Sequence, residues 1–106
     1  MKYMMLVCVD ESLQMPDVDP MPWVEEMDGR GVRLMGNRLR SVNDATTVTV
    51  RQGETVISDG PFAETKEQIA GFDIIECADL DEAIEIASKH PVARFGSIEL
   101  RPYWEE

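Results

Sequence analysis

The pattern of hydrophobic and polar positions divides this chain into short strands and two helices. Two runs, Lys2 to Asp10 and Gln68 to Cys77, are almost continuously apolar, which is typical of central strands covered on both faces. The final run, Gly96 to Arg101, alternates apolar with polar residues, so one face of this strand should be polar. Val32 to Leu39 predicts a further strand, interrupted by Gly36-Asn37.

A β-hairpin is predicted in the middle of the chain. Segments 46–51 and 54–58 are rich in β-branched residues. Between them, Gln52-Gly53 is a two-residue turn signal in which the glycine supplies a positive φ angle. The hairpin places Asp59 at its far end.

Two helices account for most of the remaining pattern. Asp19-Pro20 can serve as the N-cap and first residue of a short helix that Gly29-Arg30-Gly31 ends. Asp79 can cap the second helix while Glu82 reaches back to it, an aspartate version of the capping box. Apolar residues at helical spacing predict the buried stripe of this helix: Leu80, Ala83, Ile84 and Ala87.

The order of these elements favours an α+β fold. Strand, helix, strand, hairpin, strand, helix and strand fit a ferredoxin-like split β-α-β arrangement, with an antiparallel sheet, an inserted hairpin and both helices on one sheet face. A chain of 106 residues is expected to form one domain, residues 1–106. The other sheet face then needs a cover, which a second copy of the chain would supply. We therefore expect a homodimer.

Charge and cysteine content restrict the partners and the compartment. The chain has 21 acidic and 10 basic residues, a formal net charge of −11, which repels phosphate backbones and anionic lipids. Neither nucleic acid nor a membrane is an expected partner. Cys8 and Cys77 lie in apolar runs, where free thiols suit a reducing compartment, and the N-terminal run lacks the features of an export signal. We expect a cytoplasmic protein.

No metal or cofactor is expected from the sequence. The chain has one histidine, and its two cysteines do not form a Cys-x-x-Cys motif. Too few ligands therefore stand at a recognisable zinc spacing.

Several motifs resemble the YCII-related (DGPF-domain) family. They are Asp-Gly-Pro-Phe-Ala-Glu-Thr-Lys-Glu at 59–67, Gly-Phe at 71–72, Asp-Leu-Asp-Glu-Ala at 79–83, His-Pro at 90–91 and Gly-Ser-Ile-Glu-Leu-Arg-Pro at 96–102. The resemblance is strongest from Thr46 to Trp104 and implies a dimeric α+β barrel. Relatives tend to have a longer, uninterrupted first helix where this chain has the proline-broken, acidic segment 11–31.

The resemblance also implies a site that contains Asp59 and His90. A carboxylate that is hydrogen-bonded to one imidazole nitrogen raises the basicity of the ring. The other nitrogen can then accept or donate a proton. Such a pair would suit cofactor-free isomerisation or elimination. Each residue also has a structural interpretation: His90 can cap the end of the second helix, and Asp59 can accept backbone N–H groups in an Asx-type turn.

Three further residues are secondary candidates for substrate binding. Glu99 and Arg101 share a strand face and, with Asp73, can line a polar cavity between protomers, although an ion pair of little energetic weight is the simpler interpretation. Phe62 can wall a pocket, although aromatic residues in small domains more often serve packing.

The sequence is compatible with two functions. The first is a homodimer that binds a small organic molecule at an Asp59/His90 pocket, with isomerase or lyase activity as the chemistry that the pair would support. The alternative is a non-catalytic regulatory or accessory module, because the family is often met beside or fused to transcription-related proteins such as extracytoplasmic-function sigma factors.

Overall fold

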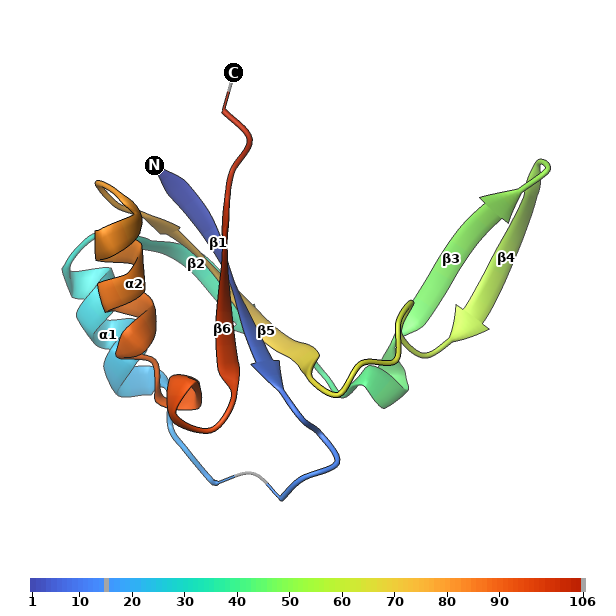
Figure 1. Cartoon of the computed structure of the whole chain (residues 1–106), viewed down its shortest axis with the longest axis horizontal. Helices are drawn as coiled ribbons and strands as arrows, with labels where there is room; N and C mark the ends of the chain where they lie inside the picture. The colour runs from blue at the N-terminus through green and yellow to red at the C-terminus, as the bar shows by residue number, and fades with distance from the viewer. Residues whose placement is uncertain (15, 106) are drawn as a thin grey trace.

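The computed structural model describes residues 1–14 and 16–105, which form a layer of helices, a layer of strands and a projecting hairpin (Figure 1). The elements in chain order are β1 (Lys2–Val9), α1 (Met21–Gly29), β2 (Arg33–Arg38), the 3₁₀ turn η1 (Val42–Asp44), β3 (Thr46–Arg51), β4 (Glu54–Asp59), β5 (Gln68–Glu76), α2 (Leu80–Ser88), the 3₁₀ turn η2 (Pro91–Arg94) and β6 (Ser97–Pro102).

The main sheet has four antiparallel strands in the order β2-β5-β1-β6. Its two central strands are β1 and β5, the two runs whose continuous apolar pattern predicted a central position. Both helices lie on the same face of this sheet (Figure 1). The α+β class and the ferredoxin-like arrangement are therefore as predicted.

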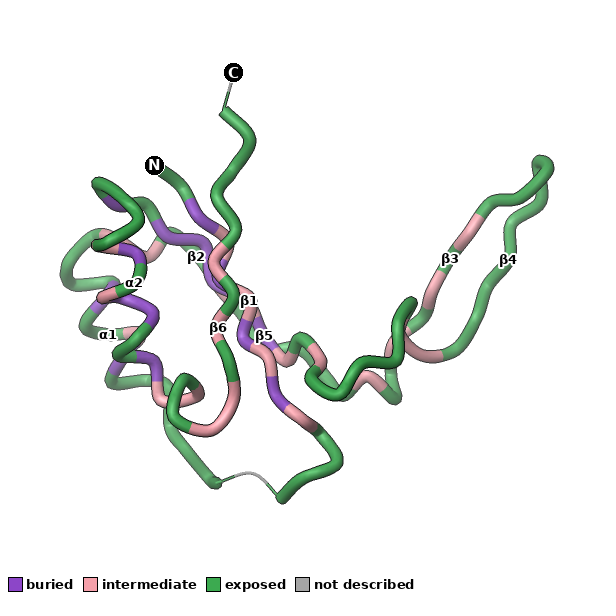
Figure 2. The backbone as a smooth tube through the Cα atoms, in the orientation of Figure 1, coloured by how far each residue is buried: buried purple, intermediate pink, exposed green. Residues whose placement is uncertain are grey.

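The hydrophobic core lies between the sheet and the helices. Figure 2 shows the buried residues concentrated at this boundary, and four large side chains are fully buried there: Met5 on β1, Met27 on α1, Ile75 on β5 and Ile86 on α2. The indole Nε1 of Trp23 donates a hydrogen bond of 3.0 Å to the Ile86 carbonyl and thereby joins the two helices.

The first helix begins one residue later than predicted. Pro20 is its N-cap, and the Asp19 carboxylate accepts a hydrogen bond of 3.0 Å from the Met21 amide. At the other end, Gly31 has φ +72° and Val32 N–H donates to the Met27 carbonyl at 3.1 Å. This is a Schellman ending, for which a glycine with positive φ is the usual residue.

Asp79 caps the second helix as predicted, but Glu82 reaches back to Ala78 instead of Asp79, and part of the predicted buried stripe is exposed. Asp79 Oδ1 accepts a hydrogen bond of 2.9 Å from the Glu82 amide, and Glu82 Oε1 accepts one of 2.9 Å from Ala78 N–H. The buried residues are Ala83, Ile86 and Ala87, whereas Leu80 and Ile84 are about half exposed. The periodicity could not decide between these two faces because both are apolar at helical spacing.

Gly36 does not interrupt β2, contrary to the prediction. It lies opposite Asp73 and makes room for an ion pair in which Arg33 Nε donates to Asp73 Oδ1 at 2.9 Å. Burial raises the pKa of Asp73, while the hydrogen bond and charge of Arg33 oppose that rise. A Cβ at position 36 would overlap Asp73 Oδ1 and lie 2.7 Å from the Phe72 carbonyl oxygen.

The β3–β4 hairpin forms a sheet of its own. The predicted two-residue turn has φ +52° at Gln52 and φ +79° at Gly53, which are the two positive angles of a type I′ turn. The hairpin and the helices stand on opposite sides of the main sheet (Figure 1). Across the described residues, no helix is long and apolar enough to cross a bilayer.

Replacing Gly36 with alanine should destabilise the fold. We expect the free energy of unfolding to fall by roughly 1–3 kcal/mol because the new methyl group must displace Asp73 or the Phe72 backbone. Urea unfolding followed by circular dichroism measures this. Gly29→Ala is the matched control: nothing lies within 4 Å of its added methyl group, so a gain of about 0.5–1 kcal/mol is expected for alanine in a helix. Equal stability of Gly36→Ala and the wild type would contradict the role given to Gly36.

Candidate functional site

The sheet face opposite the helices is apolar along its central strands and, among the described residues, has no covering layer (Figure 1). Tyr3 and Met5 of β1 point into the helix-side core, so the alternate residues Met4, Leu6 and Cys8 lie on the other face. These three are half-buried, and their partners on β5 include Phe72, opposite Leu6. We call this surface the open face.

Glu99 and Arg101 lie on the open face, and Asp73 does not. Glu99 pairs with Leu6 and Arg101 with Met4 in the sheet register. Arg101 Nη1 lies 3.2 Å from Glu99 Oε2, and both side chains are more than half exposed. Asp73 pairs with Met5 on the helix side, so the idea that it joins Glu99 and Arg101 in one cavity is wrong. Glu99 and Arg101 form a surface ion pair, which is the simpler interpretation given in the sequence analysis.

A groove of about 520 Å³ lies at the base of the hairpin, around Asp59. Its walls come from the turn after β1, from η1 and from the segment between Asp59 and Gln68. The volume falls in the range of small-molecule sites, roughly 300–1,000 Å³. Four carboxylates and one lysine line the groove: Asp10, Glu11, Asp59, Glu64 and Lys66.

Local hydrogen bonds hold the loops that line this groove. Ser12 donates to Asp10 Oδ1 from its hydroxyl at 2.6 Å and from its amide at 3.0 Å. These two bonds, assisted by the charge of Lys66, lower the pKa of Asp10. On the opposite wall, the Gln68 side-chain amide donates to the carbonyls of Ala63 and Thr65 at 3.1 Å each. The groove is therefore acidic, and its loops are tied down on both sides.

Asp59 is the last residue of β4 and is exposed. Within residues 1–14 and 16–105, no hydrogen bond or ion pair engages its carboxylate. The Asx-type turn offered as a structural alternative is thus not formed. The turn is held from the other strand, because Thr47 Oγ1 donates to the Gly60 carbonyl at 2.8 Å. The Asp59 carboxylate is free to meet a ligand.

His90 is buried and takes part in a structural contact. It precedes η2, and its Nδ1 accepts a hydrogen bond of 3.1 Å from the Val92 amide. The ring meets Trp23 edge-on, with 4.8 Å between centroids, and only 5% of the residue is exposed. Burial lowers the pKa of His90. His90 therefore caps the 3₁₀ turn that follows α2, whose own C-cap is Lys89.

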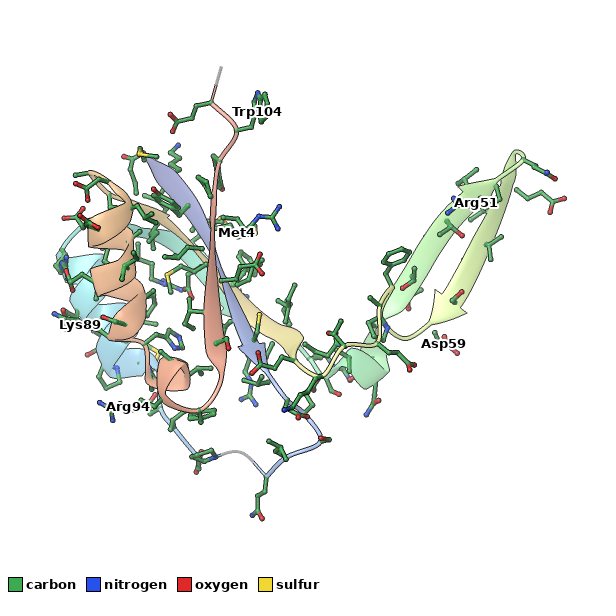
Figure 3. All side chains as sticks on the ribbon, in the orientation of Figure 1. Met4, Arg51, Asp59, Lys89, Arg94 and Trp104 are labelled. Carbon is green, nitrogen blue, oxygen red and sulfur yellow. The ribbon has the colours of Figure 1, made fainter. Side chains whose placement is uncertain are left out.

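The structure does not bring Asp59 and His90 of one chain together. Figure 3 shows Asp59 at the base of the hairpin, whereas Lys89 and Arg94, which flank His90 in sequence, lie on the far side of the sheet. His90 does not line the groove, and neither does Phe62, which is 84% exposed.

Sequence reasoning missed most of the residues around Asp59. Asp10 is more than fifty positions from Glu64 and Lys66 but meets them because Val9 at the end of β1 pairs with Gln68 at the start of β5. Antiparallel pairing of the two central strands was the signal that would have placed the turn after β1 beside the segment before β5.

Comparison with known proteins identifies the family. The model of the YCII-related domain matches residues 1–106. This chain belongs to the YCII-related domain family. An uncharacterised protein of Rhizobium meliloti (strain 1021) is 49% identical over 67 residues, a match that spans 61% of this chain and 54% of that protein. The chain therefore spans about half the length of this relative, and the predicted resemblance is confirmed for the YCII-related domain.

The pH dependence of stability tests the buried state of His90. Because burial places its pKa below the ordinary value of 6.5, the unfolded chain takes up this proton first as the pH falls. The contribution of His90 is thus complete above 6.5 and is lost as the pH falls through the folded pKa. We expect His90→Asn, which keeps an acceptor for the Val92 amide, to lose less stability than the wild type between about pH 7.5 and pH 5. Urea denaturation at both values measures this, and parallel losses would show that His90 is not buried as the neutral ring.

Proposed function

We propose that this YCII-related protein is a homodimer that binds a small organic molecule in the groove beside Asp59. The observation that carries the proposal is the unpaired Asp59 carboxylate at the mouth of a groove whose walls are held by their own hydrogen bonds. Convergent polar groups in a preformed concave site are the usual features of small-molecule recognition.

The charge of the groove favours one class of ligand. Four carboxylates against one lysine give a negative potential, to which the net charge of −11 adds. Ligands with amine or hydroxyl donors suit such a site, and anionic ligands do not. The two free cysteines, Cys8 and Cys77, agree with the reducing environment of the cytoplasm, which is the location we propose.

In any catalysis, Asp59 would act without the help of His90 from the same chain. A carboxylate can accept a proton in an isomerase or lyase reaction, but the imidazole proposed to assist it is buried beside Trp23. Ligand binding is the function that the geometry supports, and any proton transfer would use the groove carboxylates.

The dimer is proposed through the open face. Met4, Leu6 and Phe72 present an apolar surface, and surfaces of this kind are usually covered by a partner. A two-fold axis brings the same surface of a second copy against it. The Glu99–Arg101 pair at the β6 edge can then exchange partners, with Arg101 of each copy facing Glu99 of the other.

A regulatory or accessory module remains the alternative because two aromatic side chains are almost fully exposed. Phe62 is 84% and Trp104 is 89% exposed, and exposed aromatic residues are enriched in protein-binding surfaces. A module that docks on a transcription-related protein such as a sigma factor would use them and would tolerate the loss of Asp59.

Asp59→Asn should abolish ligand binding and leave the fold intact. The substitution removes the unpaired charge of the groove, and no described contact that holds the turn depends on that carboxylate. A screen of cationic and polyhydroxylated compounds by thermal melting, repeated on the variant, measures both properties. Asp17→Asn, an exposed aspartate outside the groove, is the control. Undiminished binding by Asp59→Asn would favour the accessory module, and collapse of melting would make Asp59 a folding residue.

Leu6→Glu should dissociate the dimer. The substitution places a charge in the middle of the open face, where burial against a partner would be unfavourable by several kcal/mol. Light scattering at micromolar concentration should report a dimer for the wild type and a monomer for the variant. Leu80→Glu on the exposed side of α2 is the matched control and should remain dimeric. A monomeric wild type would overturn the dimer.

A further inference from the structure

We propose that the β3–β4 hairpin, residues 46–59, is an arm that packs against the partner copy and closes the Asp59 groove at the subunit interface. The inference rests on the dimer of the proposed function and goes beyond it, because it assigns the hairpin a partner and makes the groove incomplete in a single chain.

The hairpin has little to hold it within its own chain. Among the described residues, its two strands pair only with each other, and Thr47 Oγ1 donates a hydrogen bond of 2.8 Å to the Gly60 carbonyl at its base. An isolated two-stranded hairpin is marginally stable at best in water. The projection also makes the molecule extended: its radius of gyration is 15.7 Å, against about 13 Å for a compact chain of this length.

One face of the arm is an exposed apolar row. Val48 stands directly opposite Ile57, and Val50 follows on the same face. Their exposed fractions are 58%, 67% and 59%. The tube in Figure 2 shows that the arm carries no buried residue. Exposed β-branched rows on free strand edges promote association unless something covers them.

The direction of the arm indicates that the partner copy covers its apolar row. The arm stands on the side of the sheet that faces away from the helices (Figure 1), so any body seated on the open face lies next to it. Six residues per strand give the arm a reach of about 20 Å, and packed layers are about 10 Å apart. An arm of this length passes the partner's sheet and reaches its helix layer.

The open face alone is small for a standard protein–protein interface. Four strands of about six residues give the open face a plan area of roughly 400 Å², which is about half of the ~800 Å² that each partner buries in a standard interface. One face of the arm has a plan area of roughly 200 Å². By two-fold symmetry each copy gives one arm and receives another, so the arms supply about the missing half.

The groove is continuous with this interface. Gln68 lines the groove, and the next residue, Ile69, pairs with Cys8 on the open face, where Ile69 is 43% exposed. Phe62 lies in the segment that joins the arm to the sheet and is 84% exposed. A partner seated between the open face and the arm therefore borders the groove and lies near the segment that carries Phe62.

Mixed dimers test the arm directly. One subunit carries ¹⁵N, and the other carries a nitroxide spin label at the arm tip through Arg51→Cys, both in a Cys8→Ala, Cys77→Ala background whose dimeric mass is checked first. We expect selective loss of amide signals in the ¹⁵N subunit, which does not carry the label. With the label moved to Glu25→Cys on α1, the affected amides of the ¹⁵N subunit should instead be those of its own arm, residues 46–59, which reaches the helix layer of the labelled copy.

The outcomes separate the arm from the dimer. A dimer in which the label broadens only its own subunit, or nothing, overturns the arm and leaves the open-face dimer standing. A monomeric wild type overturns both. As a second measurement, Val48→Lys with Ile57→Lys should weaken dimerisation by roughly tenfold or more, because these side chains form the apolar row; an unchanged dissociation constant contradicts the arm.

Discussion

The central constraint on this molecule is a sheet whose central strands are apolar on both faces, while the helices cover only one face. Along β1, Tyr3 and Met5 enter the helix-side core while Met4 and Leu6 face the other way. Covering the second face is worth about 25 cal/mol for each Å² of apolar surface removed from water. The same demand is the basis for the proposed dimer and for the role proposed for the arm that stands beside the open face.

The groove combines features that a single element could not supply. The antiparallel register of β1 and β5 brings the turn after one strand against the segment before the other, and the hairpin adds Asp59 from a third direction. Hydrogen bonds from Ser12 and Gln68 fix the loops before any ligand arrives. Such preorganisation reduces the cost of binding. His90 belongs to the helix layer, where its ring supports Trp23 and caps a turn.

Local signals in the sequence predicted local structure well. The Gln52-Gly53 turn, the Asp79 cap and the central position of β1 and β5 depend on near neighbours or on burial of whole strands, and all three are observed. The errors concern relations between elements. Which side of α2 is buried depends on how the helix sits on the sheet. Gly36 is required by its close approach to Asp73, which is far from it in sequence and pairs with Arg33. The pairing of Asp59 with His90 likewise depended on the fold, which places them on opposite sides of the sheet.

The central claim is that a second copy covers the open face and holds the arm. Amide hydrogen exchange of residues 46–59, measured above and well below the dimer dissociation constant, tests it most directly because exchange reports local opening. The account predicts strong protection of the β3–β4 amides in the dimer and fast exchange on dilution, while the core amides of β1 and β5 stay protected throughout. Arm amides that exchange at one rate at every protein concentration would contradict it.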